Sequence, residues 1–217
     1  MTPYSILITG VGGQGTLLAA KIVSRAAALA GFDVKTSEVH GMAQRGGAVA
    51  SHVRFDKTKV YSPVIDIGRA DAVLALEMLE ALRGADYLKP EGRMFVSEQT
   101  IYPSSVTAGF AVYPPDIAQS LKKRFAPERL TFIDAVCEAQ KALDNGGDLN
   151  RAVLSGEKCA NVFMLGVLAA HLSADAQTRQ IEEDLWREAV KTSVKPRFAR
   201  VNEQVFSAGF LCFRSMR

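Results

Sequence analysis

An uninterrupted G-x-G-x-x-G near the start of the chain carries the residues best suited to bind a phosphate group. It follows an apolar run of strand type and precedes a helical pattern, which is the context that this fingerprint requires. Glycines let the backbone turn sharply and approach a ligand, while the helix start presents unpaired N–H groups to an anion. A P-loop is excluded, because Thr16 stands where that motif has its lysine. We predict a phosphate-binding turn at Gly10, Gly12, Gly13, Gln14 and Gly15, the alternative being glycines that only pack a helix on a strand.

A second glycine-rich segment, HGMAQRGG at residues 40–47, has the composition of an anion contact. An arginine followed by two glycines allows a guanidinium group and exposed backbone N–H groups to converge on one oxyanion. The alternative is a polar loop with a solvated arginine. We predict a binding role for Arg45, Gly46 and Gly47, with supporting hydrogen bonds from His40 and Gln44. His52, in the strand that follows, is expected to be a surface or hydrogen-bonded structural residue.

A strand, a helix and a second strand must position these two segments. The helix after the first glycines is predicted from apolar residues at spacings of three to four, namely Leu18, Ile22, Ala26 and Leu29. Residues 32–39 partly alternate between apolar and polar and are predicted to form the second strand. A Rossmann unit places an acid for a ribose about 20 residues beyond its glycines. Glu38 is the candidate for that acid.

The remainder of the chain alternates between strand and helix patterns. Further strands are expected at residues 48–55, 71–77, 93–97 and 130–134, with short strands at residues 59–61 and 110–113. Residues 158–172 are apolar nearly all round, so this helix should be buried in the core or under a partner subunit. The order predicts an α/β fold, a three-layer Rossmann-like arrangement with a mostly parallel sheet and helices on both faces. We expect one domain over residues 1–217, with 158–217 as its helical C-terminal part.

Composition narrows the class of protein further. The 217 residues are 48% hydrophobic with a net charge of +3, too weakly basic to indicate nucleic-acid binding. The three isolated cysteines, Cys137, Cys159 and Cys212, form no C-x-x-C, so neither a metal site nor an iron–sulfur cluster is predicted on this chain. The longest apolar block, residues 162–170, is far shorter than the ~20 residues that a membrane span needs. The chain is expected to be cytoplasmic and not bound to membranes.

No self-contained catalytic machinery is visible in the sequence. It has no nucleophile elbow, no H-E-x-x-H and no carboxylate pair in a hydrolase context. We therefore assign no catalytic residue. The pattern indicates a domain that binds a phosphate-bearing ligand while the chemistry is completed elsewhere.

Several segments resemble the β subunits of indolepyruvate:ferredoxin oxidoreductases and, more broadly, the γ domain of the 2-oxoacid:ferredoxin oxidoreductases. The resemblance covers nearly the whole chain and is carried by ILITGVGGQGTLLAAKIVSRAA, SEVHGMAQRGGAVASHVRF, DAVLALEMLEAL, KCANVFMLG and KPRFARVNEQVFSAGF. The HGMAQRGG form points to the indolepyruvate branch. Residues 145–157 depart from the family pattern and are interpreted as a surface insertion.

The resemblance implies oxidative decarboxylation of an aryl-pyruvate, with CoA accepting the acyl group and ferredoxin the electrons. It also implies a large partner subunit that carries thiamine diphosphate and the iron–sulfur clusters. CoA would then be the guest of the two glycine-rich segments, and this chain would be inactive alone. Whether the isolated chain forms a homodimer stays open.

Two other classes of function remain in view. A free-standing NAD-dependent oxidoreductase would use the glycine turn and Glu38, although no substrate domain is evident. A non-catalytic assembly subunit, with glycines that are purely structural, would fit the apolar helix at residues 158–172. Binding of NAD or of CoA by the chain would distinguish the dehydrogenase from the ferredoxin oxidoreductase subunit. The activity of a complex with substituted glycines would distinguish a ligand-binding subunit from one that serves assembly only.

Overall fold

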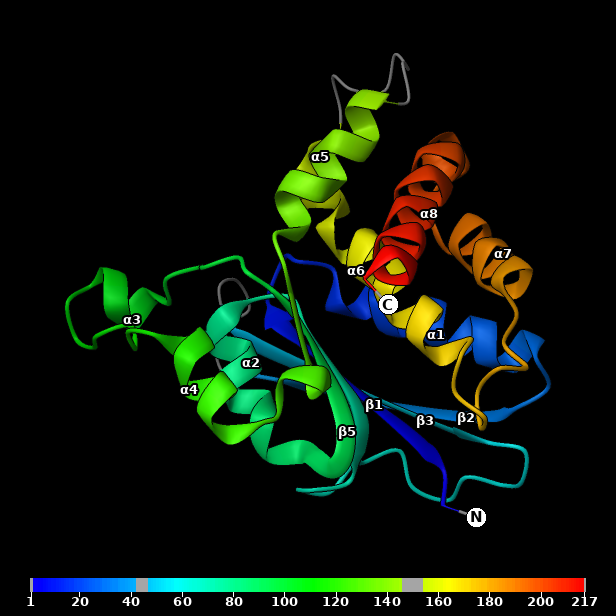
Figure 1. Cartoon of the computed structure of the whole chain (residues 1–217), viewed down its shortest axis with the longest axis horizontal. Helices are drawn as coiled ribbons and strands as arrows, with labels where there is room; N and C mark the ends of the chain where they lie inside the picture. The colour runs from blue at the N-terminus through cyan, green and yellow to red at the C-terminus, as the bar shows by residue number, and fades with distance from the viewer. Residues whose placement is uncertain (1, 42–46, 146–153, 217) are drawn as a thin grey trace.

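The computed structural model describes residues 2–41, 47–145 and 154–216. Six strands in these residues form one sheet: β1 (Tyr4–Val11), β2 (Asp33–His40), β3 (Ala48–Asp56), β4 (Ala70–Ala75), β5 (Leu88–Ser97) and β6 (Leu130–Ile133). Their spatial order is β2-β3-β1-β4-β5-β6 (Figure 1). Pairing is parallel from β1 through β4 and β5 to β6, whereas β3 is antiparallel to both β1 and β2. The mostly parallel sheet is confirmed, with β3 as the strand that runs against the others.

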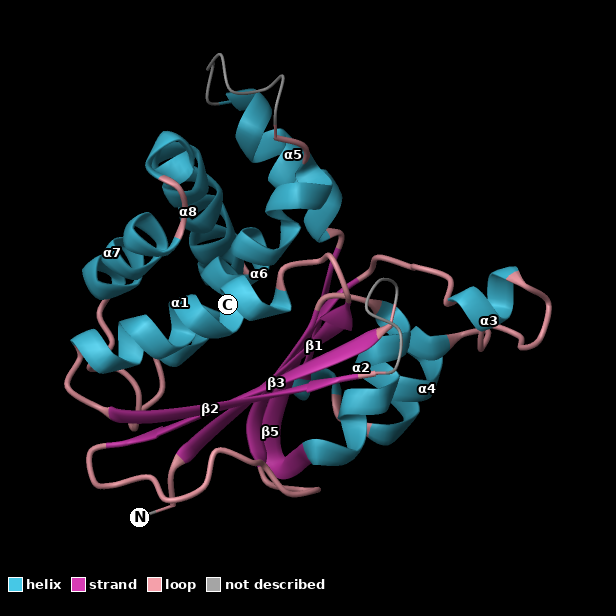
Figure 2. Cartoon of the chain, turned by 180° about the vertical axis from the view of Figure 1, so that it is seen from behind, coloured by secondary structure: helices cyan, strands magenta, loops and turns pink. Residues whose placement is uncertain are grey.

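The helices form a layer on each face of the sheet (Figure 2). One layer contains α1 (Thr16–Leu29), α5 (Ala135–Asn145), α6 (Gly156–Leu172), α7 (Glu183–Ser193) and α8 (Ala199–Ser215). The other contains α2 (Met78–Gly84) and α4 (Ile117–Arg124), while α3 (Ser104–Thr107) lies on an arm that projects from the sheet edge. Short 3-10 turns occupy Ala85–Tyr87, Pro127–Arg129 and Pro196–Phe198. The predicted three-layer α/β fold is therefore confirmed.

Each face of the sheet has its own hydrophobic core. Alternate residues of β1 divide between them, so that Ile6 and Ile8 pack under the large helical layer while Leu7 packs under α2 and α4. Almost every side chain of α6 is buried, as its all-round apolar sequence predicts. Trp186 of α7 is also fully buried, against Phe206 of α8. This packing holds the strands and α1 in fixed positions around the sheet edge where the glycines lie.

Two short strands expected from the sequence are wrong. Residues 59–61 are irregular: the Val60 N–H donates to the Asp33 side chain (2.8 Å) and does not pair with a strand of the described residues. Residues 110–113 are also irregular and belong to the projecting arm. Smaller differences concern boundaries: β5 begins at Leu88, before the predicted start at 93, and Leu29 of α1 is exposed where a buried face was expected.

Among the described residues, no helix is both long enough and apolar enough to cross a membrane. Most of the predicted insertion at residues 145–157 lies outside the described residues, which resume at Leu154 and lead directly into α6.

Candidate functional site

The carboxyl ends of β1 and β4 mark the point at which the chain changes from one face of the sheet to the other. From β1 the chain enters α1 in one helical layer, and from β4 it enters α2 in the other. Open α/β sheets bind ligands outside such a switch point, because the two diverging connections leave a crevice there. The predicted glycine turn lies directly at this position.

Three glycines of the turn have different structural reasons to be glycine. A Cβ on Gly10 would lie 2.8 Å from Thr16 Cγ2, and one on Gly15 would lie 2.3 Å from Asn161 Nδ2. Gly13 and Gly15 both have positive φ, 109° and 80°. A Cβ on Gly13, however, would have no atom within 4 Å. A Cβ at Gly10 or Gly15 would thus displace neighbouring side chains, and Gly15 also needs its positive φ, whereas Gly13 leaves backbone facing open space.

The side chain of Gln14 braces the turn across the switch point. Its Oε1 accepts a hydrogen bond from the Val11 N–H (2.7 Å), and its Nε2 donates to the Leu76 carbonyl and to Gln99 Oε1 (both 2.8 Å). These bonds connect the loops that follow β1, β4 and β5. Within the structure, the Gln14 amide therefore fixes the shape of the turn.

The structure brings part of the second glycine-rich segment to the same place. The Gly12 N–H donates to the Gly47 carbonyl at 2.9 Å, and the Gly41 N–H donates to the Ala48 carbonyl at 2.8 Å. Gly12 and Gly47 are thus in contact, as expected if the two segments form one site. Gln44, Arg45 and Gly46 lie outside the described residues.

Glu38 and His40 lie on the side of the sheet that α1 covers. Glu38 pairs in register with Ser51, and His40 pairs with Val49. Their side chains approach each other at 3.6 Å between Glu38 Oε2 and His40 Nε2, and both are exposed. Because β3 lies between β2 and β1, Glu38 is two strand spacings, roughly 10 Å, from the strand that carries the glycines. A Rossmann dinucleotide site instead has its acid on the strand next to β1, so this order does not favour the NAD alternative.

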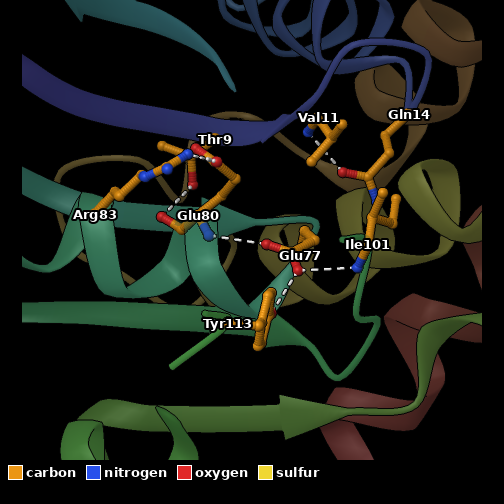
Figure 3. A network of polar contacts seen from close by, with 8 residues as sticks. All are labelled: Thr9, Val11, Gln14, Glu77, Glu80, Arg83, Ile101 and Tyr113. Atoms are coloured by element: carbon orange, nitrogen blue, oxygen red, sulfur yellow. Dashed lines mark hydrogen bonds and ion pairs between the residues drawn. The ribbon is translucent and has the colours of Figure 1, made fainter. Parts of the chain in front are cut away.

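A buried carboxylate that the sequence analysis did not single out organises the opposite side of the switch point (Figure 3). Glu77 follows β4 and is fully buried. Its Oε1 accepts hydrogen bonds from the Ile101 N–H (3.0 Å) and the Tyr113 hydroxyl (2.6 Å), and its Oε2 accepts one from the Glu80 N–H (3.0 Å). Burial, and then the bond to Glu77, raise the pKa of the Tyr113 phenol, which keeps it protonated as a donor.

A second carboxylate lies beside the first. Glu80 is buried and forms an ion pair with Arg83 (2.5 Å), and its carbonyl accepts a hydrogen bond from Thr9 Oγ1 (3.2 Å). Burial raises the pKa of the Glu80 carboxyl, and Arg83 opposes that rise. A cavity of about 310 Å³ opens here, and its lining includes Glu77, Glu80, Arg83, Val11 and Gly47. It adjoins the glycine turn through Val11.

The missed residues had a weak signal in the sequence. Glu77 ends the apolar run that forms β4, and an acid directly after a buried parallel strand lies at the carboxyl edge of the sheet. Tyr113 had no comparable signal, because its contact with Glu77 spans 36 residues.

Several side chains have structural roles. His52 accepts a hydrogen bond from the Ile65 N–H through Nδ1 (3.2 Å), as expected for a hydrogen-bonded residue. Asn161 donates to the Gly15 carbonyl (3.3 Å). In the described part of the chain, no cluster of three or more His, Cys, Asp or Glu side chains is placed to hold a metal ion.

The sequence of the chain matches a known protein family and several of its members. The model of the pyruvate ferredoxin/flavodoxin oxidoreductase family matches residues 5–212. The indolepyruvate oxidoreductase subunit IorB of Thermococcus kodakarensis is 34% identical over 100% of this chain and 98% of its own length. The IorB subunit of Archaeoglobus fulgidus is 36% identical over 95% of this chain and 93% of its own length.

Solved structures share the fold at lower sequence identity. The γ subunit of a keto/oxoacid ferredoxin oxidoreductase from Geobacter sulfurreducens superposes with a TM-score of 0.64 at 24% identity, covering 98% of this chain and 99% of its own. The 2-oxoglutarate:ferredoxin oxidoreductase of Magnetococcus marinus superposes with a TM-score of 0.68 at 18% identity, covering 100% of this chain but 32% of the longer one. The family model that matches residues 5–212, together with the IorB relatives at 34–36% identity, shows that the chain belongs to the pyruvate ferredoxin/flavodoxin oxidoreductase family.

Proposed function

We propose that this chain is the small subunit of a thiamine-dependent aryl-pyruvate:ferredoxin oxidoreductase, acting as one γ-type domain over residues 1–217. In the proposed complex, the glycine turn and the Arg-Gly-Gly segment bind the phosphates of CoA. A larger subunit holds thiamine diphosphate and the iron–sulfur clusters, and passes electrons to ferredoxin. This chain supplies binding and assembly and has no activity alone.

The full-length likeness to the IorB subunits carries this proposal. Four such relatives are 31–36% identical to the chain over at least 95% of its length, and all four are named for indolepyruvate. The common γ subunit of the pyruvate and ketoisovalerate oxidoreductases of Pyrococcus furiosus is 29% identical over 62% of the chain. We therefore propose an aryl-pyruvate, and not pyruvate or ketoisovalerate, as the substrate of the complex.

The geometry of the glycine turn supports a phosphate-bearing ligand. Gly13 leaves open space above the backbone, and the turn leads into the N-terminus of α1, where helical N–H groups and the helix dipole favour an anion. Gly47 contacts the turn at Gly12, and Arg45 stands only two residues before Gly47 in the sequence. The solved Magnetococcus protein, which shares this fold, is described with coenzyme A bound.

A pair of glycine substitutions tests the proposal. Gly13→Ala places a methyl group in the open space where the ligand would lie, and Gly68→Ala is its control, because Gly68 also has positive φ and no atom within 4 Å of a Cβ. Gly68 lies in the loop before β4, at the opposite edge of the sheet. Both changes should cost a similar ~1–2 kcal/mol of backbone strain. Only Gly13→Ala should raise the Michaelis constant for CoA in the assembled complex.

The assay is reduction of ferredoxin that depends on indolepyruvate and CoA, with the chain coexpressed with its larger subunit. Equal Michaelis constants for CoA in the two variants would remove the glycine turn from the CoA site. Calorimetric titration of the purified chain with CoA and with NAD provides a second measurement. Binding of NAD without CoA would overturn the proposal in favour of a free-standing dehydrogenase.

A further inference from the structure

An arm of residues 101–113 projects from the carboxyl edge of the sheet (Figure 1). Both ends of the arm are attached to the same buried atom, because Glu77 Oε1 accepts hydrogen bonds from the Ile101 N–H and from the Tyr113 hydroxyl. Tyr102 and Tyr113 also pack edge to face across the base, with ring centroids 5.2 Å apart. Glu77 thus closes the base of the arm as a clamp.

The arm has defined backbone geometry although none of its residues is buried. Backbone bonds from Phe110 and Ala111 to the Ser105 carbonyl (2.8 and 3.1 Å), and from Gly109 to Val106 (3.0 Å), close its tip. Backbone hydrogen bonds that hold the tip in this shape reduce the conformational entropy that binding would have to remove.

The tip presents apolar side chains to solvent. Phe110 is 88% exposed and Val112 is 87% exposed, with Tyr102 at 58% nearer the base. Residues 99–115 contain no charged side chain, in a protein whose residues are 23% charged. Large apolar side chains gathered on a neutral projection mark a protein-binding site, because the surfaces of monomers rarely expose them together.

The absence of charge identifies the kind of partner. Partner proteins that bind only transiently are commonly recognised by complementary charge, which steers the encounter of the two proteins and makes their binding sensitive to salt. Permanent subunit interfaces are more apolar and resemble a core divided between two chains. A neutral arm with an aromatic tip therefore fits a permanent partner chain, and the relatives of this protein are themselves named as subunits.

The base of the arm also adjoins the candidate ligand site. Gln99, two residues before Ile101, accepts a hydrogen bond from Gln14 of the glycine turn, and its carbonyl accepts one from the Met78 N–H (3.0 Å). A chain that holds the arm therefore lies beside the glycine turn. This is the side on which the larger subunit must approach if it is to use a ligand bound there.

We propose that residues 101–113 form a docking arm whose Phe110 and Val112 insert into an apolar pocket of the larger subunit, with Glu77 as the clamp at its base. The inference rests on the proposed function for the existence of that subunit. It adds the surface through which the two chains join and the reason why that surface lies next to the glycine turn.

The test compares two double variants of the full chain for binding to the purified larger subunit. Phe110→Ser with Val112→Ser removes the apolar tip. Tyr61→Ser with Ile67→Ser is the matched control, because these side chains are 85% and 72% exposed in the loop at the opposite edge of the sheet. We expect the tip variant to raise the dissociation constant by at least about 10-fold and the control to change it by less than about 2-fold. Melting temperatures of the isolated chains should match the wild type, because all four side chains are exposed.

Each outcome decides the question. Equal affinity of the tip variant and the wild type would overturn the docking arm while leaving the proposed function intact, provided that the wild-type complex is active. If the wild-type chain does not bind the larger subunit, the proposed function fails and the inference fails with it. If light scattering shows a wild-type homodimer that the tip variant alone dissociates, while the larger subunit still binds normally, the occupant is a second copy and the proposal is wrong.

Discussion

Gly166 of α6 and Gly209 of α8 allow these two helices to cross in backbone contact. A Cβ on Gly166 would lie 2.1 Å from the Phe206 carbonyl oxygen and 3.1 Å from the carbonyl carbon of Gly209. A Cβ on Gly209 would lie 2.0 Å from the Phe163 carbonyl oxygen. The contact matters for the site because α6 also carries Asn161, which packs against the glycine turn at Gly15.

Substitution of Gly209 by Ala is expected to destabilise the protein by about 2–3 kcal/mol, because the helices must separate to admit the methyl group. Leu211→Ala is the control on the same helix, since Leu211 is exposed and its truncation should cost less than about 0.5 kcal/mol. Urea denaturation of both variants measures the difference. A Gly209→Ala protein as stable as the wild type would show that the crossing is looser than described.

Replacement of Glu77 by Ala should release the arm from the sheet edge. Alanine removes both acceptor oxygens, so the Ile101 N–H, the Tyr113 hydroxyl and the Glu80 N–H all lose their partner. We expect a loss of about 2–3 kcal/mol in the free energy of unfolding and faster amide hydrogen exchange at Ile101. Tyr113→Phe removes one bond and should have a smaller effect, near 1 kcal/mol. Unchanged exchange at Ile101 in Glu77→Ala would contradict the clamp.

Arg45 is predicted to contact a CoA phosphate in the assembled complex. Arg45→Ala should raise the Michaelis constant for CoA by about 10- to 100-fold, the value of a charge-assisted hydrogen bond, with kcat preserved at saturating CoA. Arg45→Lys should recover part of the affinity. Arg25→Ala, which removes an exposed arginine of α1, serves as the control for the loss of one positive charge. If Arg45→Ala leaves the Michaelis constant unchanged, Arg45 has no role in CoA binding.

Acid should weaken the fold through His52. Burial lowers the pKa of His52 below its usual 6.5, so the unfolded chain takes up a proton that the folded chain resists. Stability contributed by the neutral ring is therefore present above pH 6.5 and is lost as the pH falls through the folded pKa, by at most about 1.4 kcal/mol per pH unit. Urea midpoints at pH 7.5, 6.5 and 5.5 should fall more steeply for the wild type than for His52→Asn, whose amide oxygen can accept the Ile65 bond. If the urea midpoints of the two proteins fall equally with pH, His52 is not the source of the acid sensitivity.

The local parts of the site were predictable from the sequence. The turn at residues 10–15 lies between a strand and a helix, as its glycine pattern requires, because the conformations involved depend on residues that are neighbours in the chain. The buried helix α6 was predictable for the same reason, since its apolar sequence leaves no polar face for water.

Features set by distant contacts were not predictable in this way. Residues 110–113 have a strand-like composition, yet they pair with none of the strands that the structure describes, and the Tyr113 hydroxyl donates to Glu77 instead. The position of β3 between β1 and β2 follows from pairing between residues such as Tyr4 and Phe55, which no local pattern records. A role for Glu77 was not predictable, because a single acid after a strand is common. Its importance lies in the three hydrogen-bond donors that the fold brings to its carboxylate.

The insertion of β3 has a consequence for the order in which the protein folds. The β2–β3 pairs closest to the turn, such as His40 with Val49, join residues near in the chain, whereas β3 pairs with β1 across a loop that includes α1. Loop closure costs more entropy for the longer connection, so we expect the β2–β3 hairpin to form first and then dock beside β1. Pulsed hydrogen exchange should then show protection at Gly12, whose N–H bonds to Gly47, later than within the hairpin. The glycine turn would thus take its final shape late, when the completed hairpin docks beside it.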